Sequence, residues 1–102
     1  MDIPLELGVT FRGVDVREET VYFARRCGAR LRRRSPGSDE RIEVFLERAA
    51  GSSVVKAIVV WSAGGDLLVA HGEDPDELLA LSNSFASLEG RASDATALTE
   101  LH

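Results

Sequence analysis

The chain has 102 residues, 44% of them hydrophobic and 28% charged, and a formal net charge of -5 at pH 7. This length and composition predict one soluble globular domain with its own core. No uncharged run approaches the roughly 20 residues of a membrane-spanning helix, and the N-terminus lacks the basic and apolar regions of a signal peptide. The single cysteine, Cys27, cannot form an internal disulfide. We therefore expect a cytoplasmic protein.

The first predicted element is a half-buried strand, because every second residue from Leu5 to Phe11 is apolar. Gly13 breaks this run. Asp15, with Glu18 three residues later, is typical of an N-cap and capping box, and predicts a helix that continues to about Arg33. The spacing of apolar and small residues predicts its buried face: Val16, Thr20, Phe23, Ala24, Cys27 and Leu31.

Three strands are predicted next, after the Ser-Pro-Gly-Ser break at residues 35–38. Alternation at residues 42–47 indicates the first, and a short turn at 49–53 connects it to the second, residues 54–62, which is apolar at almost every position. The glycines at 64 and 65 favour a tight turn into the third strand, from Leu67 to about Gly72. The 54–62 strand is expected to be central in the sheet.

A second helix is predicted from Asp74, as its N-cap, with Pro75 at the first helical position. Its apolar stripe comprises Leu78, Leu81, Phe85 and Leu88. Gly90 is expected to end this helix. Residues 1–90 would then form a single domain, and residues 91–102 a C-terminal tail that is either a short helix or disordered.

The order β-α-β-β-β-α predicts an α+β fold, with a four-stranded sheet and both helices packed on one face. The other face would then be open. Phe45, Ile58 and Val60 fall in the opposite phase to the core residues of their strands. We therefore expect these three residues to form an interface, most simply with a second copy in a homodimer. The alternative interpretation is that they are scattered exposed apolar residues, which small proteins commonly have.

Six of the twelve Lys and Arg residues lie within residues 25–34 of the first predicted helix. Helical spacing places an exposed aromatic ring and several guanidinium groups on one stripe, a surface suited to phosphates and unstacked bases. The predicted RNA-binding residues are Tyr22, Arg25, Arg26, Arg30, Arg33 and Arg34. The alternative is a solvated face whose C-terminal arginines interact favourably with the negative end of the helix dipole, with Arg26 and Arg30 paired to nearby acids.

The sequence resembles the ribosome hibernation-promoting factor and ribosome-associated inhibitor family, also called sigma-54 modulation proteins. The resemblance covers roughly residues 5 to 88. Its motifs are Val9-Thr10-Phe11-Arg12-Gly13, the following helix, the 42–47 strand, the Gly64-Gly65-Asp66-Leu67 turn and the helix opened by Asp74. The resemblance implies the same β-α-β-β-β-α fold and a domain that binds the small ribosomal subunit and inhibits translation in stressed cells.

The chain departs from that family in the charge of its second helix. Members place Lys and Arg on both helices, whereas residues 66–100 here contain eight acids against Arg91 alone. Binding carried by the first-helix arginines alone would be weak and salt-sensitive. The charge balance therefore leaves a second interpretation open, a non-catalytic interaction or dimerisation module that has kept the fold and lost ribosome binding.

No catalytic or metal-binding constellation is indicated, so neither an enzyme nor a cofactor is expected. Cys27 falls on a predicted buried helix face. His71 and His102 have no companions at metal-ligand spacing. The acids at 74, 76 and 77 are explained by helix capping.

Overall fold

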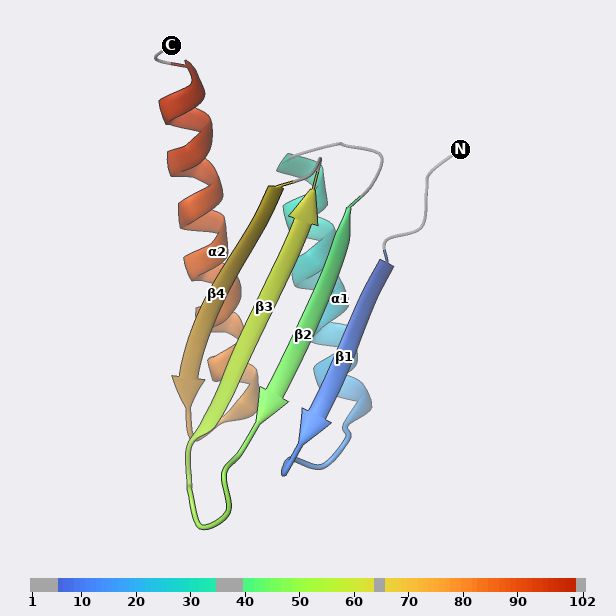
Figure 1. Cartoon of the computed structure of the whole chain (residues 1–102). Coiled ribbons are helices and arrows are strands. Elements are labelled where there is room, and N and C mark those ends of the chain that lie inside the picture. Colours follow the sequence, from blue (N-terminus) through green and yellow to red (C-terminus); the bar gives the residue numbers. More distant parts are fainter. Residues whose placement is uncertain (1–5, 35–39, 64–65, 101–102) are drawn as a thin grey trace.

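The computed structural model describes residues 6–34, 40–63 and 66–100. The predicted order of elements is confirmed (Figure 1): β1 (Glu6–Arg12), α1 (Glu18–Arg34), β2 (Arg41–Glu47), β3 (Val55–Ala63), β4 (Asp66–Asp74) and α2 (Glu77–Glu100). None of the described helices combines the length and apolarity that crossing a membrane requires.

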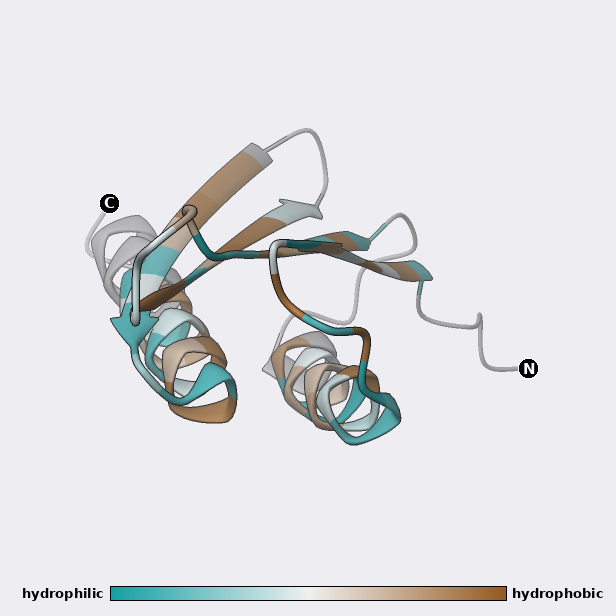
Figure 2. Cartoon of the chain, turned by 90° about the horizontal axis from the view of Figure 1, so that it is seen from below, coloured by the Kyte–Doolittle hydropathy of each residue, from teal (hydrophilic) through white to brown (hydrophobic). Residues whose placement is uncertain are grey.

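The four strands form one mixed sheet in the order β1-β2-β3-β4. The β1–β2 pair is parallel, and the other two pairs are antiparallel. A parallel pair needs a crossover, and α1 provides it between β1 and β2. Both helices lie on the same face of the sheet, as predicted, and no described element covers the other face (Figure 2). The predicted central strand, β3, has neighbours on both sides.

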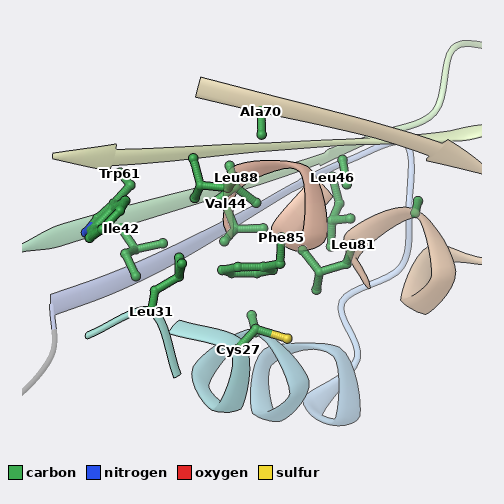
Figure 3. Packing of buried hydrophobic residues seen from close by; sticks show 14 of the residues in the cluster. Cys27, Leu31, Ile42, Val44, Leu46, Trp61, Ala70, Leu81, Phe85 and Leu88 are labelled. Carbon is green, nitrogen blue, oxygen red and sulfur yellow. The ribbon is translucent and has the colours of Figure 1, made fainter. Parts of the chain in front are cut away.

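The core lies between the sheet and the two helices, because alternate residues of the strands point toward the helices. The registered positions Ile42 and Trp61, Val44 and Val59, and Leu46 and Ala57 are all buried on this face. Phe85 of α2 points between the sheet and α1, above Cys27 (Figure 3). The predicted helix faces largely hold, since Thr20, Ala24, Cys27 and Leu31 of α1 and Leu81, Phe85 and Leu88 of α2 are buried.

Two glycines allow close backbone approaches around this core. Gly13 has a φ of 70° and follows β1, where a Cβ atom would lie 2.3 Å from the Arg48 carbonyl oxygen. Gly72 of β4 packs directly under α2, where a Cβ atom would lie 2.2 Å from the Ala80 carbonyl oxygen. The absence of a side chain at Gly72 therefore sets how closely α2 approaches the sheet.

The start of α1 differs from the prediction. The helix begins at Glu18, and the Arg17 carbonyl accepts the first backbone hydrogen bonds, from Thr20 and Val21. Asp15 is therefore not the N-cap, and Val16 precedes the helix with 74% of its surface exposed instead of lying on the buried face. Of the predicted capping pair only Glu18 lies in the first turn, where it and Glu19 face the positive end of the helix dipole.

The start of α2 also differs from the prediction. Asp74 is the last residue of β4, and its side chain accepts a hydrogen bond from the backbone N–H of Asp76 at 2.9 Å. The Asp76 carboxylate then accepts from the N–H groups of Leu78 and Leu79, at 2.8 and 3.3 Å. Asp76 is therefore the N-cap instead of Asp74, because β4 continues two residues beyond Gly72 and Asp74 is still paired with Val55.

The predicted end of α2 at Gly90 is wrong, because the helix continues to Glu100. Residues 91–100 are part of α2 and not a separate tail, and residues 101–102 lie outside the described residues. Gly90 does not have the positive φ of a C-terminal glycine cap. A glycine in the interior costs a helix only about 1 kcal/mol, and the alanine-containing segment that follows favours continuation.

Candidate functional site

The arginine-rich segment is the C-terminal part of α1, and its described arginine side chains are exposed. Tyr22 is 66% exposed, and Arg25, Arg26 and Arg30 are exposed as well. Arg33 and Arg34 belong to the helix backbone, but their side chains lie outside the described residues.

The exposed arginines of α1 point in two directions. Successive helical residues are about 100° apart around the axis, so Arg25 and Arg26 project to different sides. Arg26 and Arg30 line a groove between α1 and α2, whereas Arg25 does not. Tyr22 lies four residues before Arg26 and so belongs to the same stripe. We call Tyr22, Arg26 and Arg30 the groove-side stripe.

The groove has a volume of about 490 Å³ and combines apolar and cationic walls. It is lined by Phe23, Arg26, Cys27, Ala29 and Arg30 of α1, and by Ser82 and Phe85 of α2. Burial raises the pKa of the Cys27 thiol, and the charge of Arg30 opposes this shift only in part. Cys27 is therefore a protonated, largely buried wall of the groove and not an activated nucleophile.

Polar contacts hold the two helices together beside this groove. At the start of both helices, the buried Glu77 carboxylate accepts hydrogen bonds from the Thr20 hydroxyl at 3.1 Å and from the Arg17 guanidinium at 3.3 Å. Farther along, Arg30 donates to Glu89 at 2.9 Å. The pairing expected under the alternative interpretation is thus present for Arg30. Arg26 forms no ion pair within the described part of the chain.

The α2 wall of the groove contributes no described cation. Its polar residues near Arg30 are Ser82 and Glu89, and Glu89 already binds Arg30. The one arginine of α2, Arg91, donates to the backbone carbonyl of Val69 in β4 instead. Among the described side chains, the cations that line the groove therefore all come from α1. Sequence reasoning missed the role of Glu89, since nothing in the sequence links residues 59 positions apart.

The three predicted interface residues lie together on the open face of the sheet. Phe45 is registered with Ile58, and the next apolar position along β3, Val60, is registered with Val69 of β4. All four are partly buried by their neighbours on this face. The predicted interface did not include Val69. Its two-residue spacing from Leu67 could have indicated that it belongs to the apolar residues of one face of β4.

The described residues offer no metal site, since no three His, Cys, Asp or Glu side chains gather there as ligands would. His71 is exposed on β4 and registered with Ile58. The groove itself has guanidinium donors beside aromatic and apolar walls, which is the chemistry of a binding surface.

Similar folds are found among solved structures. The N-terminal domain of Protein Y from Thermus thermophilus matches with a TM-score of 0.75 and 20% identity, over 86% of this chain and 94% of that one. A ribosomal subunit interface protein from Coxiella burnetii matches with a TM-score of 0.75 and 18% identity, over 91% of this chain and 99% of that one. No protein-family model matches the chain, and no curated protein is similar to it in sequence.

These two proteins cover almost the whole chain, so the resemblance noted in the order of sequence motifs extends to the three-dimensional fold. At this level of identity the likeness establishes the fold. The function must be argued from the surface.

Proposed function

We propose that this domain is a non-enzymatic, ribosome-associated translation inhibitor that acts in the cytoplasm of stressed cells, and that it contacts RNA of the small ribosomal subunit through the groove-side stripe of α1. The observation that carries the proposal is the combination of two features. The fold is that of a ribosomal subunit interface protein, and half of the chain's positive charge lies on its first helix.

The groove-side stripe has the chemistry that RNA contacts need. Arg26 is exposed and makes no ion pair among the described residues, so its guanidinium is available to a phosphate. Tyr22, one turn earlier, presents an exposed ring on which an unstacked base can lie. Arg33 falls on the same stripe by helical spacing and Arg34 beside it, so we include both.

The neutral and acidic character of α2 determines the strength of this binding. Because α2 contributes no described cation to the groove, few phosphate contacts form, and the net charge of -5 opposes approach to a polyanion. We therefore propose a weak interaction that falls with salt. Its specificity would come from the shape of the ribosomal site and not from charge alone.

A pair of neighbouring charge reversals tests the proposal. Arg26→Glu and Arg25→Glu change the net charge equally, but only Arg26 lines the groove. We expect Arg26→Glu to reduce co-sedimentation with small ribosomal subunits and inhibition of a cell-free translation reaction by at least about tenfold. Arg25→Glu should cause a smaller loss. Equal losses would show that only overall charge matters, and no loss in either would remove the stripe from the proposal.

A second candidate function is a non-catalytic protein-interaction module. The observation that favours it is the apolar centre of the open sheet face, formed by Phe45, Ile58, Val60 and Val69. This face lies on the side of the sheet opposite the helices, so the two functions use different surfaces (Figure 2).

A further inference from the structure

We propose that the open face of the sheet binds a second copy of this chain, in a face-to-face dimer whose two-fold axis runs parallel to the strands. This inference does not depend on ribosome binding, because the groove lies on the opposite side of the sheet. It rests on the apolar centre of the face and on the order of charges across one end of it.

The centre of the face is apolar, and the one carboxylate that shares its rows is turned away from it. Phe45 and Ile58 form one cross-strand pair, and Val60 and Val69 form the next. Glu43 lies in the same row as Val60, but its carboxylate extends over Gly8 of β1 and binds the Arg41 guanidinium at 2.8 Å. The four apolar side chains are therefore left to pack against a partner.

One row of charges alternates in sign across all four strands. The registered positions are Arg12 of β1, Glu47 of β2, Lys56 of β3 and Glu73 of β4. Arg12 and Glu47 are 3.7 Å apart at their charged atoms. Since registered residues of a sheet share a face, all four charges project from the open side.

A two-fold axis parallel to the strands makes this row self-complementary. It places β1 of one copy over β4 of the other and β2 over β3, while each row keeps its height. Arg12 then meets the partner's Glu73, and Glu47 meets the partner's Lys56. In the adjacent row, Phe45 meets the partner's Ile58. Every contact occurs twice, as a closed dimer requires.

The other face-to-face arrangement, with the axis across the strands, fits less well. It would place Lys56 and Glu73 over the partner's Ser62 and Leu67, which leaves two of the four charges without a counter-charge. The charge order therefore selects the axis parallel to the strands.

The size of the face sets the expected affinity. Four strands about 4.8 Å apart, with seven residues rising about 3.3 Å each, give a face of roughly 19 by 23 Å. Two such faces bury on the order of 1,000 Å² in total, at the low end for specific interfaces. We therefore expect a reversible dimer with a micromolar dissociation constant.

Two complementary single variants provide the test. Arg12→Glu places like charges opposite each other in its own homodimer, and Glu73→Arg does the same with the opposite sign. A mixture of the two variants restores both ion pairs in the heterodimer. Positions 12 and 73 lie on opposite edge strands, so this rescue cannot arise within one copy. Native mass spectrometry and sedimentation of the separate and mixed full-length chains measure the result.

We expect the wild type to dimerise, each single variant to dimerise about tenfold more weakly, and the heterodimer to exceed either homodimer by at least about tenfold. Ile58→Lys should abolish dimers while the circular dichroism spectrum stays folded, and Arg25→Glu should leave them unchanged. A wild type that remains monomeric up to about 1 mM would overturn the proposal and leave the face to another partner or to solvent. A statistical mixture of homodimers and heterodimers would overturn the proposed axis.

Discussion

The Thr20 hydroxyl donates a hydrogen bond of 3.1 Å to the Glu77 carboxylate, which joins the first turn of α1 to the first residue of α2. Both side chains are buried, and Arg17 reaches the same carboxylate at 3.3 Å. Together with the pair between Arg30 and Glu89, this contact fixes the separation of the helices. The groove that separates them therefore has defined walls.

Removing the Glu77 carboxylate should destabilise the domain. Glu77→Ala leaves the buried Thr20 hydroxyl without its acceptor, a loss of about 1–3 kcal/mol. Glu18→Ala is the matched control, because Glu18 is also the first residue of its helix but is exposed. The control should cost only about 0.3–1 kcal/mol, from the helix dipole. Urea denaturation followed by circular dichroism measures both, and equal losses would contradict the buried contact.

Alanine should have opposite effects at two glycines. At Gly72, a Cβ atom would lie 2.2 Å from the Ala80 carbonyl oxygen and 2.6 Å from the Ser84 nitrogen, both of them backbone atoms of α2. Gly72→Ala should therefore cost about 1–3 kcal/mol or more, because α2 must move away from the sheet. At Gly90 a Cβ atom meets nothing within 4 Å, so Gly90→Ala should stabilise α2 by about 0.5–1 kcal/mol. Thermal and urea unfolding measure both, and destabilisation by Gly90→Ala would contradict a helix continuing through residue 90.

The strands and the buried helix faces could be predicted because the spacing of hydrophobic residues along the chain indicates both. Residues such as Val44, Leu46, Ala24 and Leu31 recur at the period of their element, and all are buried. The helix starts were harder, because more than one acid lies close to the start of each helix. Asp74 and Asp76 are both good caps by residue type, and the length of β4 decides between them, which depends on pairing with Val55.

The site was predicted only in part, because its second wall depends on tertiary packing. The groove-side stripe follows from helical spacing alone. The pairing of Arg30 with Glu89 does not, since it depends on how α2 lies beside α1. Gly90 illustrates a competing local effect, in which a strong C-cap residue type is outweighed by the helix that continues beyond it.

The Cys27 thiol should react slowly in the folded domain. Burial raises its pKa above the ordinary value of 9.0, so less thiolate is present at any pH than in the unfolded chain. The rate with a disulfide reagent at pH 8 should rise by at least about tenfold on unfolding in urea.

The same shift implies a pH dependence of stability. The pKa of the Cys27 thiol is higher in the folded domain than in the unfolded chain, so the protonated thiol contributes to the free energy of unfolding, and this contribution is fully present below pH 9. It is lost as the pH rises through the folded value, because the unfolded thiol ionises first. Cys27→Ala should lack this component in an alkaline unfolding series. In the reactivity experiment, a rate of thiol reaction in the folded domain equal to that in the urea-unfolded chain would contradict a buried, protonated thiol.

Releasing Arg30 from its partner should strengthen RNA binding. Glu89→Gln removes the acceptor charge while Arg30 remains 62% exposed, so the cost in stability should stay within about 1 kcal/mol. We expect ribosome affinity to rise about twofold to fivefold, since one further guanidinium becomes available for a phosphate. Asp15→Asn makes the same charge change at an exposed residue outside both proposed surfaces and is the control. Equal gains from both variants would attribute the effect to net charge.

The central claim is that α1 carries a weak, electrostatic contact to ribosomal RNA, and a salt titration of wild-type co-sedimentation with small ribosomal subunits tests it most directly. With about three phosphate contacts, the logarithm of the affinity should fall with a slope of about -2 against the logarithm of salt concentration. Binding at low salt that disappears along this slope is the predicted result. No binding at low salt would contradict the ribosome proposal.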